Sequence, residues 1–195
     1  MKYLLPFLLL TLGLQAAEPR VLRFNIYLFG DSIGQMTITQ HRLPDGIERY
    51  VIKSASSAKI LWVNRSNYSD YEFTLQNGRL IATSYRETEN GQLSRWGTMK
   101  YDGSQYVVNN YRGTFRFTEP PLYSIVSIYF GDMRAAQRLY YDTEAEFVKV
   151  EHPDANTIEF KTSDGHRNVY HYLNGSLHHL EVHVSIATVK MVRVN

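Results

Sequence analysis

Hydrophobic and polar residues alternate along most of this chain, with a period of two. Between residues 23 and 29, Phe24, Ile26 and Leu28 fall on one face of the segment, and the alternation resumes between residues 33 and 40. This pattern is typical of β-strands that bury one face and expose the other. It predicts strands at the start of the fold and over most of the remaining chain.

The hydrophobic period lengthens to about 3.6 in the stretch between residues 120 and 131. The apolar residues of this stretch have the spacing of one helix face: Leu122, Ile125, Val126, Tyr129 and Phe130. Pro121 suits the first position of a helix, and Gly131 suits its end. We therefore predict one short helix, about residues 121–131.

Asn-Gly and Asp-Gly pairs predict tight hairpin turns of type I′, in which both central residues have positive φ. The pairs are Asn77-Gly78, Asn90-Gly91, Asp102-Gly103, Asp164-Gly165 and Asn174-Gly175. Each two-residue turn also predicts which residues face each other across the hairpin. The expected partners are Leu75 with Leu80 and Phe73 with Ala82 around the first turn, and Tyr172 with Leu177, His171 with His178 and Tyr170 with His179 around the last.

The spacing of these turns implies strands of about ten residues, which form a long antiparallel meander. A meander of such strands twists and tends to curl. We expect an all-β fold in which the meander curls into a barrel or half-barrel and the helix plugs or caps its concave side. The pattern leaves open whether the sheet closes.

The first sixteen residues have the features of a signal peptide. Lys2 supplies a basic start, residues 4–14 form an apolar stretch, and Ala16 is a small residue at the cleavage site. The apolar stretch is too short to span a bilayer, although an N-terminal anchor is the alternative. The chain has no Cys, so we expect residues 17–195 to form a single domain stabilised by its core. Such a domain would be exported to the periplasm or the medium.

The charge of the chain argues against one class of partner. There are 21 Lys and Arg residues and 19 Asp and Glu residues, which gives a formal net charge of +2, and the cations are scattered. Binding to nucleic acid needs clustered cations. We therefore expect no nucleic-acid partner.

Residues 29–34 (Phe-Gly-Asp-Ser-Ile-Gly) resemble the Gly-Asp-Ser block of the GDSL-type lipases and esterases. That resemblance implies Ser32 as a nucleophile, with Asp164 and His166 as acid and base. However, a nucleophile elbow needs a helix directly after the serine, whereas residues 35–40 alternate like a strand. The family spaces its acid and base one residue further apart, and its oxyanion-hole segments have no counterpart here. We therefore expect an ordinary turn, no catalytic residues and no enzyme, and keep the esterase as an alternative.

A second candidate site lies near the end of the chain, where His179, Glu181 and His183 alternate. On one face of a strand these side chains are about 7 Å apart and can converge on a zinc ion. The alternative is a solvated sheet face, and His178 interrupts the ligand pattern. We expect no metal and no other cofactor.

Aromatic residues indicate a possible cavity. A curled sheet of eight or more strands can leave an interior wide enough for one small ligand. The residues expected to line it are Trp62, Trp96, Tyr123, Tyr129 and Phe130. The alternative is a filled core, because protein interiors normally close-pack.

The order of features resembles an uncharacterised family of exported bacterial β-rich proteins, a domain of unknown function. The likeness rests on Ile33-Gly34 after the first strand, Phe73-x-x-x-Asn77-Gly78-x-Leu80, Pro121-Leu122-Tyr123, and the segment 168–177 (Asn-Val-Tyr-His-Tyr-Leu-Asn-Gly-Ser-Leu). The resemblance implies an envelope location and a curved antiparallel sheet, and it transfers no catalytic residue.

From these observations we expect a non-enzymatic exported envelope protein. Its expected partner is an apolar or amphipathic small molecule or a lipid, held in a barrel-like cavity. The two alternatives are the esterase that uses Ser32 and a structural or adhesive protein without a ligand, which would have a filled core and an exposed apolar patch.

Overall fold

The computed structural model describes residues 18–60, 62–184 and 186–194. The predicted signal peptide, residues 1–16, lies outside the described residues. The described part is built almost entirely of antiparallel strands, as the alternating pattern predicts. The strands before the helix are β1 (Arg20–Leu28), β2 (Asp31–Arg42), β3 (Ile47–Ile60), β4 (Val63–Gln76), β5 (Arg79–Glu89), β6 (Gln92–Tyr101), β7 (Tyr106–Asn110) and β8 (Gly113–Phe117).

One short α-helix interrupts the meander, and seven further strands follow it. These elements are α1 (Ile125–Phe130), β9 (Arg138–Tyr141), β10 (Glu146–Lys149), β11 (Glu151–Asp154), β12 (Thr157–Lys161), β13 (Arg167–Leu173), β14 (Ser176–Val184) and β15 (Ala187–Arg193). A single 3₁₀ turn, η1 (Pro44–Gly46), connects β2 to β3.

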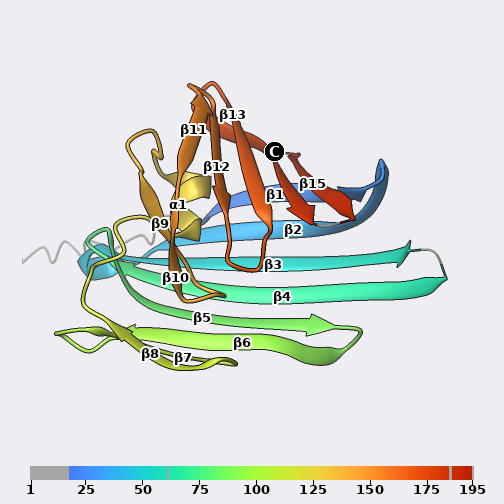
Figure 1. Cartoon of the computed structure of the whole chain (residues 1–195). Coiled ribbons are helices and arrows are strands. Elements are labelled where there is room, and N and C mark those ends of the chain that lie inside the picture. Colours follow the sequence, from blue (N-terminus) through green and yellow to red (C-terminus); the bar gives the residue numbers. More distant parts are fainter. Residues whose placement is uncertain (1–17, 61, 185, 195) are drawn as a thin grey trace, which may run out of the picture.

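Thirteen of the strands form one sheet, in the order β11-β12-β13-β14-β15-β1-β2-β3-β4-β5-β6-β7-β8. Figure 1 shows the long strands β2 to β6 side by side across the view, with β11, β12 and β13 standing steeply to them and β15 running obliquely. Within the described residues, β8 and β11 are the two edges of this sheet and do not pair with each other. The predicted curled meander is confirmed, and the sheet is open.

The small hairpin β9–β10 and the helix fill the space between the two halves of the sheet (Figure 1). Phe117 of β8 packs against Tyr140 of β9 and Phe147 of β10, with ring centroids 5.2 and 5.4 Å apart. Tyr141 of β9 packs against Phe160 of β12 at 5.8 Å. The hairpin thus connects the edge strand β8 to β12, the strand next to the other edge, through side-chain packing.

The helix is a plug, as predicted. Tyr129 makes an edge contact with Phe24 of β1, at 6.0 Å between ring centroids. The hydroxyl of Tyr172 on β13 donates to the carbonyl oxygen of Ile128 at 2.9 Å. The helix therefore touches both halves of the curled sheet and fixes their separation.

The predicted start of the helix was wrong. Pro121 lies before it, and Leu122 is 79% exposed instead of facing the core. Ser124 pairs with Tyr140 as an isolated bridge, and the Tyr140 amide donates to the carbonyl of Tyr123 at 2.8 Å. Because these contacts hold the segment extended, the helix begins only at residue 125. Its predicted end is confirmed, with Gly131 at the C-cap.

Three of the five predicted type I′ turns are confirmed. Both residues have positive φ in the pairs at 77–78, 90–91 and 174–175. In the other two pairs only Gly103 and Gly165 have positive φ. There the aspartate side chains organise the turns instead: Asp102 Oδ1 accepts hydrogen bonds from the next residues of its loop, and Asp164 Oδ1 accepts one from Thr162. Asp side chains that bond to nearby groups favour such wider turns.

The predicted registers hold next to the turns and slip by one residue beyond them. Leu75 faces Leu80 and Tyr172 faces Leu177, as expected. A β-bulge follows in each hairpin and places an extra residue, Ile81 or His178, on one strand. In consequence the actual partners are Phe73 with Thr83, His171 with His179 and Tyr170 with Leu180. A bulge shifts the pairing in this way because two residues face one.

Gly97 on β6 makes room for an aromatic side chain. Tyr85 on β5 is its cross-strand partner, and a Cβ at position 97 would lie 2.4 Å from the Tyr85 ring. We expect Gly97→Ala to displace this ring and to lower the free energy of unfolding by about 1–3 kcal/mol. Chemical denaturation measures the effect. Ser84→Ala, at an exposed neighbouring position, should change it by less than about 0.5 kcal/mol, and equal effects would contradict the prediction.

Candidate functional site

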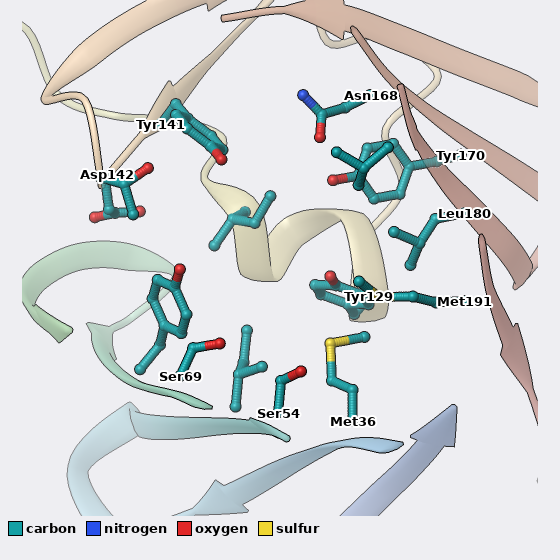
Figure 2. Close-up of a pocket in the computed structure, with 15 residues that line it drawn as sticks. Met36, Ser54, Ser69, Tyr129, Tyr141, Asp142, Asn168, Tyr170, Leu180 and Met191 are labelled. Carbon is teal, nitrogen blue, oxygen red and sulfur yellow. The ribbon is translucent and has the colours of Figure 1, made fainter. Parts of the chain in front are cut away.

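A cavity of about 160 Å³ lies on the concave side of the curled sheet, beside the helix. Figure 2 shows Met36, Ser54 and Ser69 on one side of it, Asn168, Tyr170 and Leu180 on another, and Tyr129 of the helix between them. Its apolar walls are made by Met36, Ile52, Ile125, Leu180, Val182 and Met191. The inward faces of strands from both halves of the sheet therefore contribute to one site.

Asp142 is the most unusual residue of this lining. It directly follows β9 and is 4% exposed, and in the part of the chain that the structure describes neither oxygen of its carboxylate has a hydrogen-bond partner of normal geometry. Burial raises the pKa of the Asp142 carboxyl to about 7. The hydroxyl of Thr83 and the backbone amide of Asp142 offset this rise only in part. The carboxyl therefore exchanges its proton near neutral pH.

The next carboxylate of the same turn has the opposite environment. The Glu144 side chain is fully buried, and its Oε1 lies 3.1 Å from Nη1 of Arg95. Arg112 forms a second ion pair with it, and the Tyr111 hydroxyl donates to it at 3.2 Å. Two guanidinium groups thus neutralise Glu144, while Asp142 faces the cavity without a counter-ion.

Two further buried polar groups of the lining lack partners. Among the described residues, the amide nitrogen of Asn168 and the hydroxyl of Thr143 have no hydrogen-bond partner of normal geometry, although the two residues are only 4% and 3% exposed. Buried polar groups are nearly always hydrogen-bonded, because an unsatisfied group costs about 1–3 kcal/mol. Together with Asp142 they give the cavity three polar groups with unused hydrogen-bonding capacity.

Four tyrosines complete the lining: Tyr71, Tyr129, Tyr141 and Tyr170. Burial raises the pKa of every one of these phenols above its ordinary value of 10, to about 12 for Tyr141. The Tyr71 hydroxyl donates a hydrogen bond to Glu87. The phenols are therefore neutral at physiological pH, and they present hydroxyl groups and aromatic rings to the cavity.

A family model described as Domain of unknown function (DUF6134) matches residues 24–194, nearly the whole described part of the chain. The chain belongs to this family. Its membership of a domain of unknown function agrees with the resemblance seen in the sequence. No curated protein matches the sequence significantly.

The fold of this DUF6134 chain is similar to a solved structure described as the "Crystal Structure of Beta-barrel-like Protein of Domain of Unknown Function DUF1849 from Brucella abortus". The match has a TM-score of 0.59 and 12% sequence identity, and it covers 91% of this chain and 96% of that chain. At this identity the likeness concerns the fold, which is barrel-like in both proteins. Among the described residues, no helix has the length and hydrophobicity needed to cross a membrane.

The structure does not bring the five predicted lining residues together. Tyr129 lines the central cavity. Trp62, at the tip of the β3–β4 hairpin, is 90% exposed, and Trp96 is 44% exposed on the outer side of β6. Tyr123 lies in a separate surface hollow beside residues 119–122. Trp62 was misplaced because it lies in the connection between β3 and β4, and Trp96 because it lies on the face of β6 opposite to the buried Met99.

Phe130 lines a different hollow at the end of the helix, with a volume of about 630 Å³. This hollow is larger than the central cavity, but Asp132 and Arg134 on its wall have side chains that are 58% and 83% exposed. These two residues already pair with each other. We therefore regard it as a polar surface depression and the central cavity as the better candidate site.

The predicted histidine cluster is present on β14. Glu181 lies 3.9 Å from His179 and 3.5 Å from His183. His171 of β13 joins it, and ligand atoms of His171, His179 and Glu181 lie within 4.8 Å of one another. However, the Lys190 ammonium lies 3.3 Å from Glu181 and competes with any cation for that carboxylate. The expectation that no metal binds here stays a prediction.

The partly buried His179 of this cluster predicts acid sensitivity. Burial, then the nearby Lys190 and His171, lower the pKa of His179 from 6.5 to about 4. Because the folded state favours the neutral ring, its contribution to stability is present above pH 6.5 and is lost as the pH falls toward 4. We expect His179→Gln to reduce the fall of the melting temperature between pH 6.5 and 4. His41→Gln, on β2, should keep the full fall of the melting temperature. If the melting temperatures of the wild type and both variants fall equally between pH 6.5 and 4, His179 is not the source of the acid sensitivity.

The segment around Ser32 has the geometry of a hairpin. The turn itself is made by Phe29 and Gly30, both with positive φ, and Ser32 lies in β2 opposite Tyr27. The following residues continue as β2, so the helix that a nucleophile elbow requires is replaced by a strand. Among the described residues, His166 contacts Asp164 at 3.3 Å, and no hydrogen bond links it to Ser32.

Sequence reasoning missed the buried polar residues of the site. Asp142, Thr143 and Glu144 follow one another in a hairpin turn, where exposed polar residues are normal. The available signal was weak: the three residues follow the apolar run Leu139-Tyr140-Tyr141. Their burial depends on partners far away in the chain, such as Arg95 and Arg112.

Proposed function

We propose that this protein is a non-enzymatic, exported binding protein whose central cavity holds one small amphipathic molecule. One observation carries the proposal: a cavity with apolar walls contains the buried, unsatisfied polar groups of Asp142, Thr143 and Asn168. Burying such groups without partners destabilises a fold. A ligand that forms hydrogen bonds to them and fills the apolar space would remove that cost.

The volume of the cavity limits the size of the ligand. An apolar protein cavity of about 150 Å³ holds one molecule of the size of benzene. The 160 Å³ found here therefore suits a compact molecule better than a long acyl chain. This supports a small amphipathic ligand in preference to a membrane lipid.

The chemistry of the lining supports binding in preference to catalysis. Its described residues include one carboxylate, that of Asp142, and no imidazole that could act with it. General acid–base catalysis usually needs two groups with matched pKa values on opposite sides of the substrate. Export is proposed from the features of residues 1–16 described above.

Native mass spectrometry tests this proposal. Protein purified without detergent from an exporting host should carry an extra mass of at most a few hundred daltons, which is lost on denaturation. Ser54→Leu combined with Ser69→Leu fills the cavity from two paired positions of β3 and β4 and should give the bare mass. Ser84→Leu, at an exposed position, should retain the ligand. A bare mass for the wild type, or the same extra mass on the filled variant, would contradict the proposal.

The adhesive alternative has one observation in its favour. Three exposed apolar side chains, Phe29, Trp62 and Ile186, lie in the β1–β2, β3–β4 and β14–β15 connections. The registers of β1 with β15 and of β2 with β3 place these connections at the same end of the sheet. If this end mediates self-association, replacing all three residues by Ser should abolish a concentration-dependent increase in sedimentation coefficient. A wild type that sediments as a monomer at all concentrations would exclude that role.

A further inference from the structure

The charge of the central cavity is one-sided. Of the described residues that line it, Asp142 is the one whose side chain carries a charge when ionised at neutral pH, and none is Lys, Arg or His. The other buried carboxylate of the same turn, Glu144, is paired with two arginines. Because no cationic side chain of the described lining lies next to Asp142, a ligand can supply the positive counter-charge.

Aromatic rings surround the same space. The four lining tyrosines come from separate elements, β4, α1, β9 and β13, and Figure 2 shows labelled Tyr129, Tyr141 and Tyr170 around the cavity. The faces of aromatic rings attract cations, and the attraction is strongest where water is excluded. A carboxylate surrounded by several tyrosines is the combination that recognises ammonium groups.

We propose that the cavity binds a small organic ammonium ion, with Asp142 as its counter-ion and the tyrosine rings around its apolar substituents. This inference rests on the proposed binding function and names the chemical class of the ligand. The amide of Asn168, which Figure 2 shows on a different side of the cavity from Asp142, would bond to a polar group at the other end of the same molecule.

Other ligand classes fit the site less well. An anion would be repelled by the ionised Asp142. A neutral molecule would give the ionised carboxylate no counter-ion, so it would bind to the protonated form of Asp142 and gain nothing from the charge of this residue. A hard metal ion such as Ca²⁺ takes about six to eight oxygen ligands, whereas the cavity offers one carboxylate within largely apolar walls. An ammonium ion with small alkyl groups satisfies both the charge and the apolar surface.

Binding of an ammonium ion should depend on pH. The pKa of Asp142 lies at about 7, so a cation that requires the ionised carboxylate displaces a proton when it binds at lower pH. The groups that face Asp142 are the hydroxyl of Thr83 and the phenols of Tyr85 and Tyr140. Burial keeps both phenols protonated through this range. Affinity should therefore rise between pH 6 and pH 8 because of Asp142.

Choline and 3,3-dimethylbutan-1-ol form a matched pair of ligands for the test, because they have the same shape and differ in the positive charge. Isothermal titration calorimetry on the mature protein should give an affinity for choline at least about tenfold higher than for the neutral alcohol at pH 8. For choline the affinity should be roughly tenfold lower at pH 6. Asp142→Asn should remove both differences, while Asp132→Asn, an exposed carboxylate at the end of the helix, should keep them.

The outcomes separate this inference from the proposed function. Equal binding of both compounds to the wild type, without pH dependence, would overturn the ammonium assignment and leave a general binding cavity in place. Binding of neither compound, together with a bare mass in native mass spectrometry, would overturn both proposals. A preference for choline that survives in Asp142→Asn would show that Asp142 is not the counter-ion and would also overturn the assignment.

Discussion

Replacing Glu144 with glutamine is expected to lower the free energy of unfolding by about 1.5–3 kcal/mol, because it removes the charge-assisted contacts that two arginines make with a fully buried carboxylate. The Glu144 side chain is fully buried, and two arginines approach its carboxylate from β6 and from the β7–β8 turn. Glutamine keeps the shape of the side chain and removes its charge, so Arg112 loses this carboxylate as a partner, whereas Arg95 still lies 3.9 Å from Glu87 and 3.5 Å from Asp164.

Urea denaturation at neutral pH measures this effect. The matched control is Glu119→Gln, which removes the same charge from an ion pair with Arg138 at 3.0 Å. Both side chains of that pair are more than half exposed, at 53% and 55%, so the control should cost less than about 1 kcal/mol. If the two variants lose the same stability, the turn that follows β9 is not buried as described.

Replacing Asp142 with asparagine is expected to have the opposite effect above neutral pH. The pKa of Asp142 in the folded protein, about 7, is higher than the ordinary value of 3.8. A group of this kind contributes no penalty below pH 3.8, and it destabilises the fold as the pH rises toward 7, because the unfolded chain releases the proton more readily. The asparagine side chain does not titrate in this range, so Asp142→Asn removes the loss of stability that accompanies the rise in pH.

The expected size follows from the shift of about three pKa units. Without ligand, the wild type should lose about 4 kcal/mol of stability between pH 4 and pH 8 through this group alone. Asp142→Asn should therefore match the wild type at pH 4 and exceed its stability at pH 8, as judged by denaturation at both values. Asp132→Asn, which changes an exposed carboxylate, should keep the wild-type dependence between these pH values. A wild type with no loss of stability across this range would contradict the burial of an unpartnered carboxylate.

Local sequence signals predict the architecture of this fold well. The period-two pattern gives the strands, and the Asn-Gly pairs give type I′ turns because only a few residues tolerate positive φ at both positions. Gly131 ends the helix as expected. These features depend on neighbouring residues in the chain, which is the information that a sequence pattern contains.

Features that depend on distant contacts were not predicted. The helix begins late because Tyr123 and Ser124 pair with Tyr140, and the bulges at Ile81 and His178 shift two registers. A pattern of alternating residues does not show where a strand accepts an extra residue.

The candidate site was predicted only in part, for the same reason. Tyr129 was expected to line a cavity because it lies on the apolar face of a predicted helix. Asp142 and Asn168 were missed, because a single Asp or Asn near a turn is normally exposed. Their burial results from the β9–β10 hairpin filling the space between β8 and β12, which involves residues far apart in the chain.

Asp142 is a buried carboxylate that faces a ligand-sized cavity, without a counter-ion among the described residues. The titration of its carboxyl carbon by nuclear magnetic resonance in the ligand-free protein tests this arrangement directly, with Asp142→Asn to assign the signal. We expect a pKa of about 7, which falls when choline is added. A pKa near the ordinary value of 3.8, unchanged by choline, would mean that the carboxylate is solvated or paired and that no such site exists.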